Sequence, residues 1–367
     1  MRVGILGGGQ LGRMLALAAH PLGIDTTVFD PAPEACAGQV TNHVAASFED
    51  TEMVSSFAEG LDVVTFEWEN VPLSAAEVVL QEAPLLPSPK ALAAAQDRMS
   101  EKTVFGECGI ETAPFRTVDS REHLKAAVEE VGLPAVLKTR RLGYDGKGQY
   151  VLRSPGDEDA AWAALGGSPL ILEGFVAFQR ELSIICVRNA VGETRFYALT
   201  ENHHRDGILR LSIAPAPGLT PELQAAGEEI GRKVAERLDY VGVLAIELFE
   251  VDGRLLANEM ATRVHNSGHW TIDGAVTSQF ENHMRAVCGL PLGSTATRGL
   301  SAMVNLIGTL PEASEVLAIE GAHLHLYGKE PRPGRKIGHV NVVVEDEGML
   351  RERVGAVQGL VRGAVGL

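Results

Sequence analysis

Three glycines fall within six residues of the stretch KTRRLGYDGKGQ, which covers residues 138–149. An apolar run leads into this stretch and residues 149–153 can return as a second strand, so we predict a β-hairpin with a glycine-rich tip. A simple hairpin turn needs only one such glycine. Lys138 and Lys147 add two cations to backbone amides that can face phosphates. The stretch therefore predicts a flap that closes over a polyphosphate.

A second predicted hairpin, farther along the chain, joins residues 243–250 to residues 255–259 through the turn VDGR. Its two strands would bring Glu247 and Glu259 side by side, with Asn258 next to them. Two carboxylates and an amide oxygen suit a Mg²⁺ ion that also holds phosphate oxygens. The acids could instead face solvent, but Glu247 stands in the apolar strand VLAIELF, where an idle carboxylate is costly. We therefore predict a metal site on this hairpin.

The donor-rich loop RVHNSGHW, residues 263–270, follows this hairpin directly. A polar loop could contain such residues by chance. Because the loop lies so close to the predicted metal pair, we favour a role in binding an anion or a substrate.

The N-terminal segment predicts a βαβ unit, with strands at residues 2–6 and 24–30 and a helix at residues 11–19. The turn GGGQLG at residues 7–12 and Asp30 resemble a dinucleotide fingerprint. Three interpretations of this turn stay open, namely a dinucleotide site, a site for one phosphate of any ligand, and tight strand–helix packing. Further strands alternating with helices predict a parallel sheet covered on both faces.

Length and composition exclude several classes of protein. The chain has 367 residues and a formal net charge of −16 at pH 7, so it is expected to contain two or three domains and not to bind nucleic acid non-specifically. No apolar run approaches the length of a membrane span, and no signal peptide is expected. The four scattered cysteines favour reduced thiols in a cytoplasmic protein.

The chain resembles the N5-carboxyaminoimidazole ribonucleotide synthetase family of ATP-grasp ligases, which act in de novo purine biosynthesis. The strings GGGQLGRM, TFEWENVP, KTRRLGYDGKGQ, ENHHRDGILR, NEMATRVHNSGHWT and YGKEPRPGRKIGHV carry the resemblance along nearly the whole chain. Thr262 departs from the proline expected at its position. The resemblance implies an α/β chain with a Rossmann-like, pre-ATP-grasp domain at residues 1–104, a central lid domain at 105–168 and a C-terminal ATP-grasp domain at 169–367.

The resemblance also implies an ATP site between the central and C-terminal domains. Arg98 and Lys138 would contact phosphates, and Glu247 and Glu259 would bind Mg²⁺ with help from Asn258. The flap that closes over the phosphates would be formed by Gly143, Tyr144, Asp145, Gly146, Lys147, Gly148 and Gln149. The adenosine part of ATP would meet Glu173, Phe175 and Val176 at the base, Glu181 at the ribose and His204, with His203 as the alternative.

The second substrate implied by the resemblance is 5-aminoimidazole ribonucleotide. The residues expected around it are Gln10, Leu11, Glu67, Tyr144, Asp145, Asn266, Lys329, Arg335 and Lys336. The resemblance thus assigns the glycine-rich turn to a ribonucleotide and not to NAD.

In the reaction implied by the resemblance, bicarbonate attacks ATP to give carboxyphosphate and ADP, and the ribonucleotide amine is then carboxylated. Arg263 would neutralise charge, His265 and Asn266 would orient bicarbonate and amine, and Asp145 would accept a proton. Homodimers are expected. The alternatives are a formate-dependent glycinamide ribonucleotide transformylase, an NAD-dependent oxidoreductase, and an ATP-grasp fold without activity, which the complete set of predicted ligands disfavours.

Overall fold

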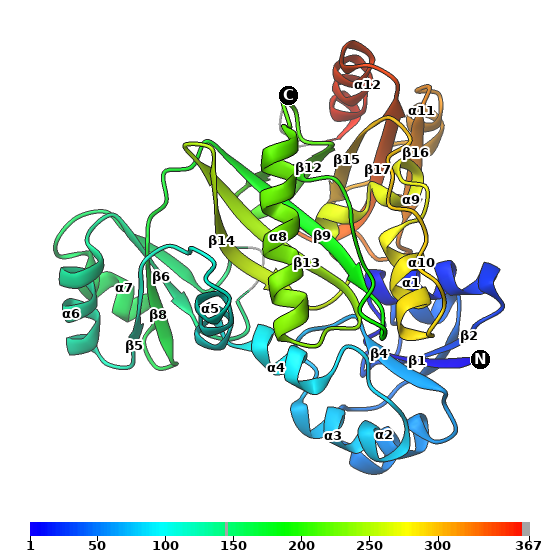
Figure 1. Ribbon diagram of the computed structural model, residues 1–367, viewed down its shortest axis with the longest axis horizontal. Coiled ribbons are helices and arrows are strands. Elements are labelled where there is room, and N and C mark those ends of the chain that lie inside the picture. Colours follow the sequence, from blue (N-terminus) through cyan, green and yellow to red (C-terminus); the bar gives the residue numbers. More distant parts are fainter. Residues whose placement is uncertain (144–145, 362–367) are drawn as a thin grey trace.

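The computed structural model describes residues 1–143 and 146–361. Its described strands form three sheets, which lie at the lower right, at the left and in the centre of Figure 1. The flap residues Tyr144 and Asp145, to which the sequence assigns contacts with both substrates, lie outside the described residues.

The first sheet is parallel, as the sequence predicts. Its order is β3 (Asn42–Val44), β2 (Asp25–Phe29), β1 (Arg2–Leu6) and β4 (Val63–Phe66). Successive side chains of β1 alternate between two buried faces. Ile5 packs with α1 (Gln10–Ala19), whereas Leu6 packs with α2 (Thr51–Ala58) and α3 (Leu73–Glu82). The prediction that helices cover both faces is confirmed.

The second sheet is antiparallel and carries the predicted flap. Its order is β5 (Phe115–Val118), β8 (Leu170–Gly174), β6 (Ala135–Thr139) and β7 (Gln149–Leu152). The predicted hairpin is present as β6 and β7, with Lys138 opposite Gln149. The helices α6 (Arg121–Val131) and α7 (Asp157–Leu165) bury the outer face of the sheet. Because β8 pairs with both β5 and β6, we propose that the central domain runs through β8 and does not end at residue 168.

The third sheet is antiparallel and the most extensive of the three. Its order along the main path is β14 (Arg254–Ala261), β13 (Gly242–Val251), β9 (Arg180–Arg188), β11 (Thr200–Arg205), β12 (Ile208–Ala214), β15 (Leu300–Ile307), β17 (Lys336–Val344) and β16 (Ala322–Leu326), with β10 (Thr194–Phe196) also paired to β9. The helices that cover it are α8 (Pro221–Arg237), α10 (Gln279–Val287), α11 (Ala313–Leu317) and α12 (Glu347–Leu360), and the short α9 (Thr271–Gly274) lies beside β17 (Figure 1).

Two helices connect the first sheet to the second. The sequence predicts only the second of these, α5 (Arg98–Glu107), whose N-cap Asp97 accepts a hydrogen bond from the Met99 amide. The proline-rich composition of residues 83–89 predicts the start of an exit from the first domain, and this segment leads directly into α4 (Pro89–Gln96). Ser88 caps α4 and Pro89 occupies its first turn, where proline has no lost hydrogen bond. The serine–proline pair is thus a helix start and not a break.

The run FYALT predicts a strand at residues 196–200, but the structure does not form one strand there. The chain instead forms β10 before this segment and the hairpin β11–β12 after it. Asp206 and Gly207 make the turn of that hairpin, with φ angles of 54° and 72°. Both angles belong to the left-handed region that two-residue hairpin turns require.

None of the helices in residues 1–143 and 146–361 combines the length and apolar character needed to cross a bilayer.

Candidate active site

One cavity of about 900 Å³ lies where the three sheets meet. Its walls contain most of the residues that the sequence assigns to a site. The predicted residues that line it are Gln10, Leu11, Glu67, Arg98, Lys138, Gly143, Gly146, Lys147, Gln149, Glu173, Phe175, Val176, Glu181, His204, Glu247, Asn258, Glu259, Arg263, His265, Asn266, Lys329 and Lys336. Gly148 and Arg335 are not part of this lining.

The predicted metal pair is formed by neighbouring strands. Glu247 on β13 lies opposite Glu259 on β14, at a bulge in the pairing of these two strands. Arg98 Nη1 lies 2.9 Å from Glu259 Oε2, and His265 Nε2 lies 3.4 Å from Glu247 Oε1. Each carboxylate therefore has one basic neighbour from outside the hairpin, and both face the cavity with Asn258.

The two carboxylates of this pair differ in charge environment. Burial and the negative charge of Glu259 raise the pKa of Glu247 to about 7. Burial by itself would raise the pKa of Glu259, but the positive charges of Arg98 and Lys138 outweigh this effect and lower the pKa. Glu259 is therefore the carboxylate held ready in its charged form, and a cation between the two would relieve the repulsion that Glu247 experiences.

This donor set fits a Mg²⁺ ion that arrives with a nucleotide. Protein sites for Mg²⁺ commonly supply one or two carboxylates and leave the other positions to water and substrate phosphates. Within the described residues, no group of three or more histidine, cysteine, aspartate or glutamate side chains could hold a metal by itself. Glu247 and Glu259 with Asn258 thus suit a shared ion better than a closed structural site.

A buried ion-pair network lies behind Lys138 in the wall of the cavity. Glu173 Oε2 on β8 lies 3.1 Å from Lys138 Nζ and 3.5 Å from Lys102 Nζ. The Lys102 side chain has no exposed area, and its ammonium group also donates to the Asn258 carbonyl at 2.8 Å. The Glu173 carboxylate is thus engaged with two lysines. Both lysines lie near Oε2, whereas Oε1 is buried and has no hydrogen-bond partner among the described residues.

The base of the flap is tied to the connecting helix. Asp97, the N-cap of α5, accepts hydrogen bonds from Arg140 Nε at 3.0 Å and Nη2 at 2.8 Å. The Arg98 amide donates to the Arg140 carbonyl at 3.0 Å. The φ angle of Gly148 is +72°, and a Cβ there would lie 2.6 Å from Thr139 Oγ1. Gly148 is thus required by the flap backbone and does not line the cavity.

A bulge in β11 separates the two neighbouring histidines, so that they face different surroundings. His204 lines the cavity and its Nδ1 is hydrogen-bonded to Glu181. His203 is outside the lining, with Nε2 3.0 Å from Glu201 Oε1. Although burial opposes it, the bond to Glu181 and the charge of Glu247 raise the pKa of His204. His204 is therefore the histidine of the pair that faces the cavity.

The glycine-rich turn after β1 does not have the free amides of a dinucleotide site. The Gly8 amide donates to Asp30 Oδ2 at 2.7 Å, and the Gly9 amide donates to Glu67 Oε1 at 2.7 Å. Asp30 also accepts from the Ala32 amide at 2.8 Å, so its carboxylate is held by the protein backbone. These contacts do not favour the dinucleotide interpretation of the turn.

The end of the cavity beside the first sheet contains Gln10 and Leu11, in the first turn of α1, where backbone amides have no intrahelical acceptor. Lys329 extends from the loop between β16 and β17, and its ammonium group donates to Gln10 Oε1. Burial lowers the pKa of Lys329. Lys336 also lines the cavity, whereas Arg335 Nη1 donates to the Glu330 carbonyl at 3.1 Å. A role for Arg335 at the ribonucleotide phosphate stays a prediction.

The donor-rich loop lies between the metal pair and this end. His265 Nδ1 lies 2.9 Å from Ser267 Oγ, and burial with the positive charges of Arg263 and Lys336 holds its pKa well below the ordinary value. Asn266 exchanges two hydrogen bonds with the amide of Asn305, of 3.1 and 2.8 Å. These contacts fix a neutral imidazole and a carboxamide toward the cavity, which suits hydrogen bonding and not charge neutralisation.

Sequence reasoning did not identify Glu69, Glu101 or Lys102. Glu69 lines the cavity and pairs with Arg263, while Glu101 Oε1 accepts from the Met260 amide beside Glu259. The signal for Lys102 was available, because it stands four residues after Arg98 and therefore on the same face of α5.

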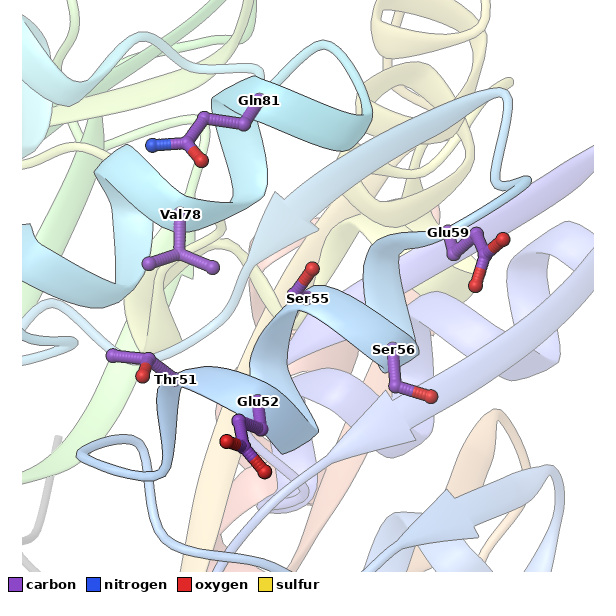
Figure 2. A pocket seen from close by; sticks show the side chains of 7 residues that line it. All are labelled: Thr51, Glu52, Ser55, Ser56, Glu59, Val78 and Gln81. Carbon is purple, nitrogen blue, oxygen red and sulfur yellow. The ribbon is translucent and has the colours of Figure 1, made fainter.

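Figure 2 shows a second hollow, between α2 and α3, that has a different character. Its lining consists of Thr51, Glu52, Ser55, Ser56, Glu59, Val78 and Gln81. These side chains include two acids and no cation, so the hollow is poorly suited to a phosphorylated ligand.

Comparisons with known proteins match all three parts of the chain. Residues 1–96 match the ribonucleotide synthetase preATP-grasp domain, residues 103–280 the ATP-grasp domain, and residues 301–353 the phosphoribosylaminoimidazole carboxylase C-terminal domain. The predicted succession of a pre-ATP-grasp domain and an ATP-grasp fold is thereby confirmed.

Several individual proteins are similar over nearly their whole length. The N5-carboxyaminoimidazole ribonucleotide synthase of Pseudomonas aeruginosa is 52% identical over 98% of this chain and 99% of its own. The crystal structure of the synthetase from Thermus thermophilus has 56% identity and a TM-score of 0.95, with 98% of each chain covered. A synthase from Aspergillus clavatus, in complex with ADP and 5-aminoimidazole ribonucleotide, has 34% identity and a TM-score of 0.90, with 98% of each chain covered.

Proposed function

The chain belongs to the N5-carboxyaminoimidazole ribonucleotide synthase family of ATP-grasp ligases, and from this premise we propose how its cavity performs the family's reaction. The reaction is the ATP-dependent carboxylation of 5-aminoimidazole ribonucleotide in purine biosynthesis. The observation that carries the proposal is one continuous cavity that joins the metal pair and flap to the glycine-rich turn and Lys329.

ATP would lie between the flap and the β13–β14 hairpin. Lys138 and Arg98 would contact its phosphates, and His204 and Glu181 would face its sugar. A Mg²⁺ ion held by Glu247, Glu259 and Asn258 would neutralise phosphate charge when bound. The ion pairs of Glu173 would keep Lys138 in place before the nucleotide enters.

Bicarbonate would be the carboxyl donor. One of its oxygens attacks the γ-phosphorus of ATP, the bond to the β-phosphate oxygen breaks, and ADP leaves with that electron pair, so that carboxyphosphate forms. Arg263 would stabilise the charge that develops on the transferred group, and His265 and Asn266 would orient bicarbonate. Closing the flap keeps water away from this labile species.

The ribonucleotide would occupy the other end of the cavity. Its phosphate would meet the first-turn amides of α1 and the side chains of Lys329 and Lys336. The exocyclic amine attacks the carboxyl carbon of carboxyphosphate, or CO₂ released from it, phosphate leaves and the amine loses a proton. Asp145 stays the predicted acceptor of that proton, and Tyr144 a predicted contact.

A phosphate-release assay with purified protein tests this function. We expect ATP turnover that requires 5-aminoimidazole ribonucleotide and bicarbonate together and that yields the carboxylated ribonucleotide. Turnover with glycinamide ribonucleotide and formate, and none with bicarbonate, would instead identify the transformylase alternative. Nicotinamide fluorescence transfer on titration with NADH would identify an oxidoreductase.

The homodimer predicted from the resemblance is an expectation for solution measurements, and the cytoplasmic location stays a prediction as well.

A further inference from the structure

The loop that follows β4 carries two carboxylates that contact different parts of the cavity. Glu67 Oε1 accepts the Gly9 amide at 2.7 Å in the turn proposed for the ribonucleotide. Glu69 Oε2 lies 2.9 Å from Arg263 Nη2, and Glu69 Oε1 accepts the Thr262 amide at 3.0 Å. One short loop of the first domain therefore contacts both the ribonucleotide turn and the segment that follows Glu259.

On its inner side this loop is hydrogen-bonded through its backbone. The Glu67 amide donates to the Leu6 carbonyl at 3.0 Å. Gln96 Nε2 donates to the carbonyls of Glu69 at 2.9 Å and Val71 at 2.8 Å. The backbone from Glu67 to Val71 is therefore connected to both β1 and α4, and Glu67 and Glu69 belong to one hydrogen-bonded loop.

The guanidinium of Arg263 depends on this loop for its orientation. Its Nη1 donates to the Val264 carbonyl at 3.0 Å, and its Nη2 is held by Glu69. Both the Arg263 and the Glu69 side chains are about one-fifth exposed, and both line the cavity. Because an ion pair with these additional hydrogen bonds is directional, the position of Glu69 decides where the free edge of the guanidinium points.

We propose that Glu69 is a positioning residue that couples ribonucleotide binding to phosphoryl transfer. A ribonucleotide against Glu67 and the glycine-rich turn holds the loop, and Glu69 then holds Arg263 where charge develops on the transferred phosphoryl group. Without the ribonucleotide, Arg263 is less well placed and ATP is less readily converted to carboxyphosphate. This inference rests on the proposed function of the cavity.

The variant Glu69→Gln tests the coupling, since the amide keeps the size and the acceptor for Thr262 but removes the charge. ADP formation is measured with bicarbonate, with and without the ribonucleotide, together with the carboxylated product. We expect the stimulation by ribonucleotide to fall about tenfold, the ADP formed per product to rise above one, and the KM for ATP to change by less than about twofold.

Glu111→Gln is the matched control. Glu111 forms an ion pair with Arg254 at 3.2 Å, but both side chains are more than half exposed and neither lines the cavity. The same chemical change there is expected to leave stimulation and the ADP-to-product ratio as in the unsubstituted protein.

Arg263→Lys shows whether Glu69 acts through Arg263, because a single ammonium group cannot keep the same oriented contacts. We expect the double variant to be no more uncoupled than Arg263→Lys alone. Unchanged stimulation and product ratio in a folded Glu69→Gln protein overturn the inference. Should that variant not fold, unchanged coupling in Arg263→Lys overturns it equally. If the unsubstituted protein shows no ribonucleotide-dependent ADP formation, the proposed function itself fails, which is a different result.

Discussion

Lys102 illustrates what single residues contribute and what the sequence conceals about them. Its position in α5 is predictable, and its spacing from Arg98 places both on one helix face. Its complete burial between Glu173 and the Asn258 carbonyl is not predictable, because those partners come from strands of two different sheets. By contrast, Glu247 and Glu259 were identifiable, since a turn of known type joins two apolar strands and sets their register.

The metal pair supplies the first prediction. Glu259→Gln keeps a hydrogen-bond acceptor but loses the charge that Arg98 and Lys138 stabilise. We expect a folded protein whose ATP turnover at saturating Mg²⁺ falls about a hundredfold or more, because a carboxylate of the proposed metal site is removed. Thermal unfolding and ADP release are the measurements. Glu107→Gln, which disturbs a partly exposed pair with Arg237, is the control. Unchanged turnover at ordinary Mg²⁺ would remove Glu259 from the metal site.

Lys329 supplies a second prediction at the same scale. Its ammonium group donates to Gln10 in the end of the cavity proposed for the ribonucleotide. Both residues are far in sequence from Glu247 and Glu259. We expect Lys329→Ala to raise the KM for the ribonucleotide about tenfold or more while the KM for ATP stays within about twofold. Steady-state kinetics with each substrate varied gives both values. Exposed Lys90 on α4 provides the control substitution. Loss of ATP binding in Lys329→Ala would contradict the assignment.

At the scale of elements, the sequence predicted a strand or hairpin correctly where the whole pattern lay within a few consecutive residues. The apolar run and the glycine-rich tip that follows it predict the hairpin β6–β7. Short apolar runs likewise predict β1, β2 and β4. The hairpin β11–β12 was missed because TENHHR is polar for a buried-sheet strand. Its turn Asp206–Gly207 was nevertheless a usable signal. The polar residues occur there because β11 presents His204 to the cavity.

The flap gives an element-scale prediction. Gly148→Ala places a Cβ 2.6 Å from Thr139 Oγ1 on a backbone with φ of +72°. We expect the flap to shift and the Kd for ATP to rise about tenfold, in line with a strain of about 1–2 kcal/mol. Binding of ATP by calorimetry measures the effect. Gly132→Ala is a matched control, because Gly132 also has a positive φ in the same domain but has open space around it. Equal effects of the two substitutions would assign the loss to backbone strain alone.

At the scale of the whole molecule, the site depends on contacts between segments that are remote in sequence. Glu69 and Arg263 are 194 positions apart, and Lys329 and Gln10 are 319 apart. No local pattern predicts which of many charged residues will meet over such separations. The resemblance to a known family supplied most of these positions, whereas Glu69 emerged only from the folded geometry. The net charge of −16 likewise conceals a cavity lined by several cations.

His283 gives a prediction for the stability of the whole molecule. It lies on α10, its Nδ1 accepts the Val243 amide at 3.1 Å, and its Nε2 is 2.8 Å from Thr65 Oγ1. It thus joins the first sheet to the third. Burial lowers the pKa of His283 to about 3 in the folded protein, against about 6.5 in an unfolded chain.

Between these two values the unfolded chain binds a proton that the folded chain does not. The contribution of His283 to the free energy of unfolding is therefore complete above about pH 6.5. It is lost as the pH falls toward about 3, by about 1.4 kcal/mol per pH unit. Denaturant unfolding from pH 7 to 5 measures the slope. We expect His283→Gln to reduce it by about that amount, and His20→Gln, at an exposed position, to leave it unchanged. An equal slope in His283→Gln would contradict the prediction.

The turn after β1 carries a consequence for protein engineering. Its Gly8 and Gly9 amides already donate to the carboxylates of Asp30 and Glu67. Two acidic side chains therefore occupy the place where the pyrophosphate of a dinucleotide would bind. Replacing either acid alone would leave the other carboxylate facing that pyrophosphate. A conversion of this scaffold to a dinucleotide carrier therefore needs two simultaneous changes, and one of them removes a contact on which the native substrate pocket is built.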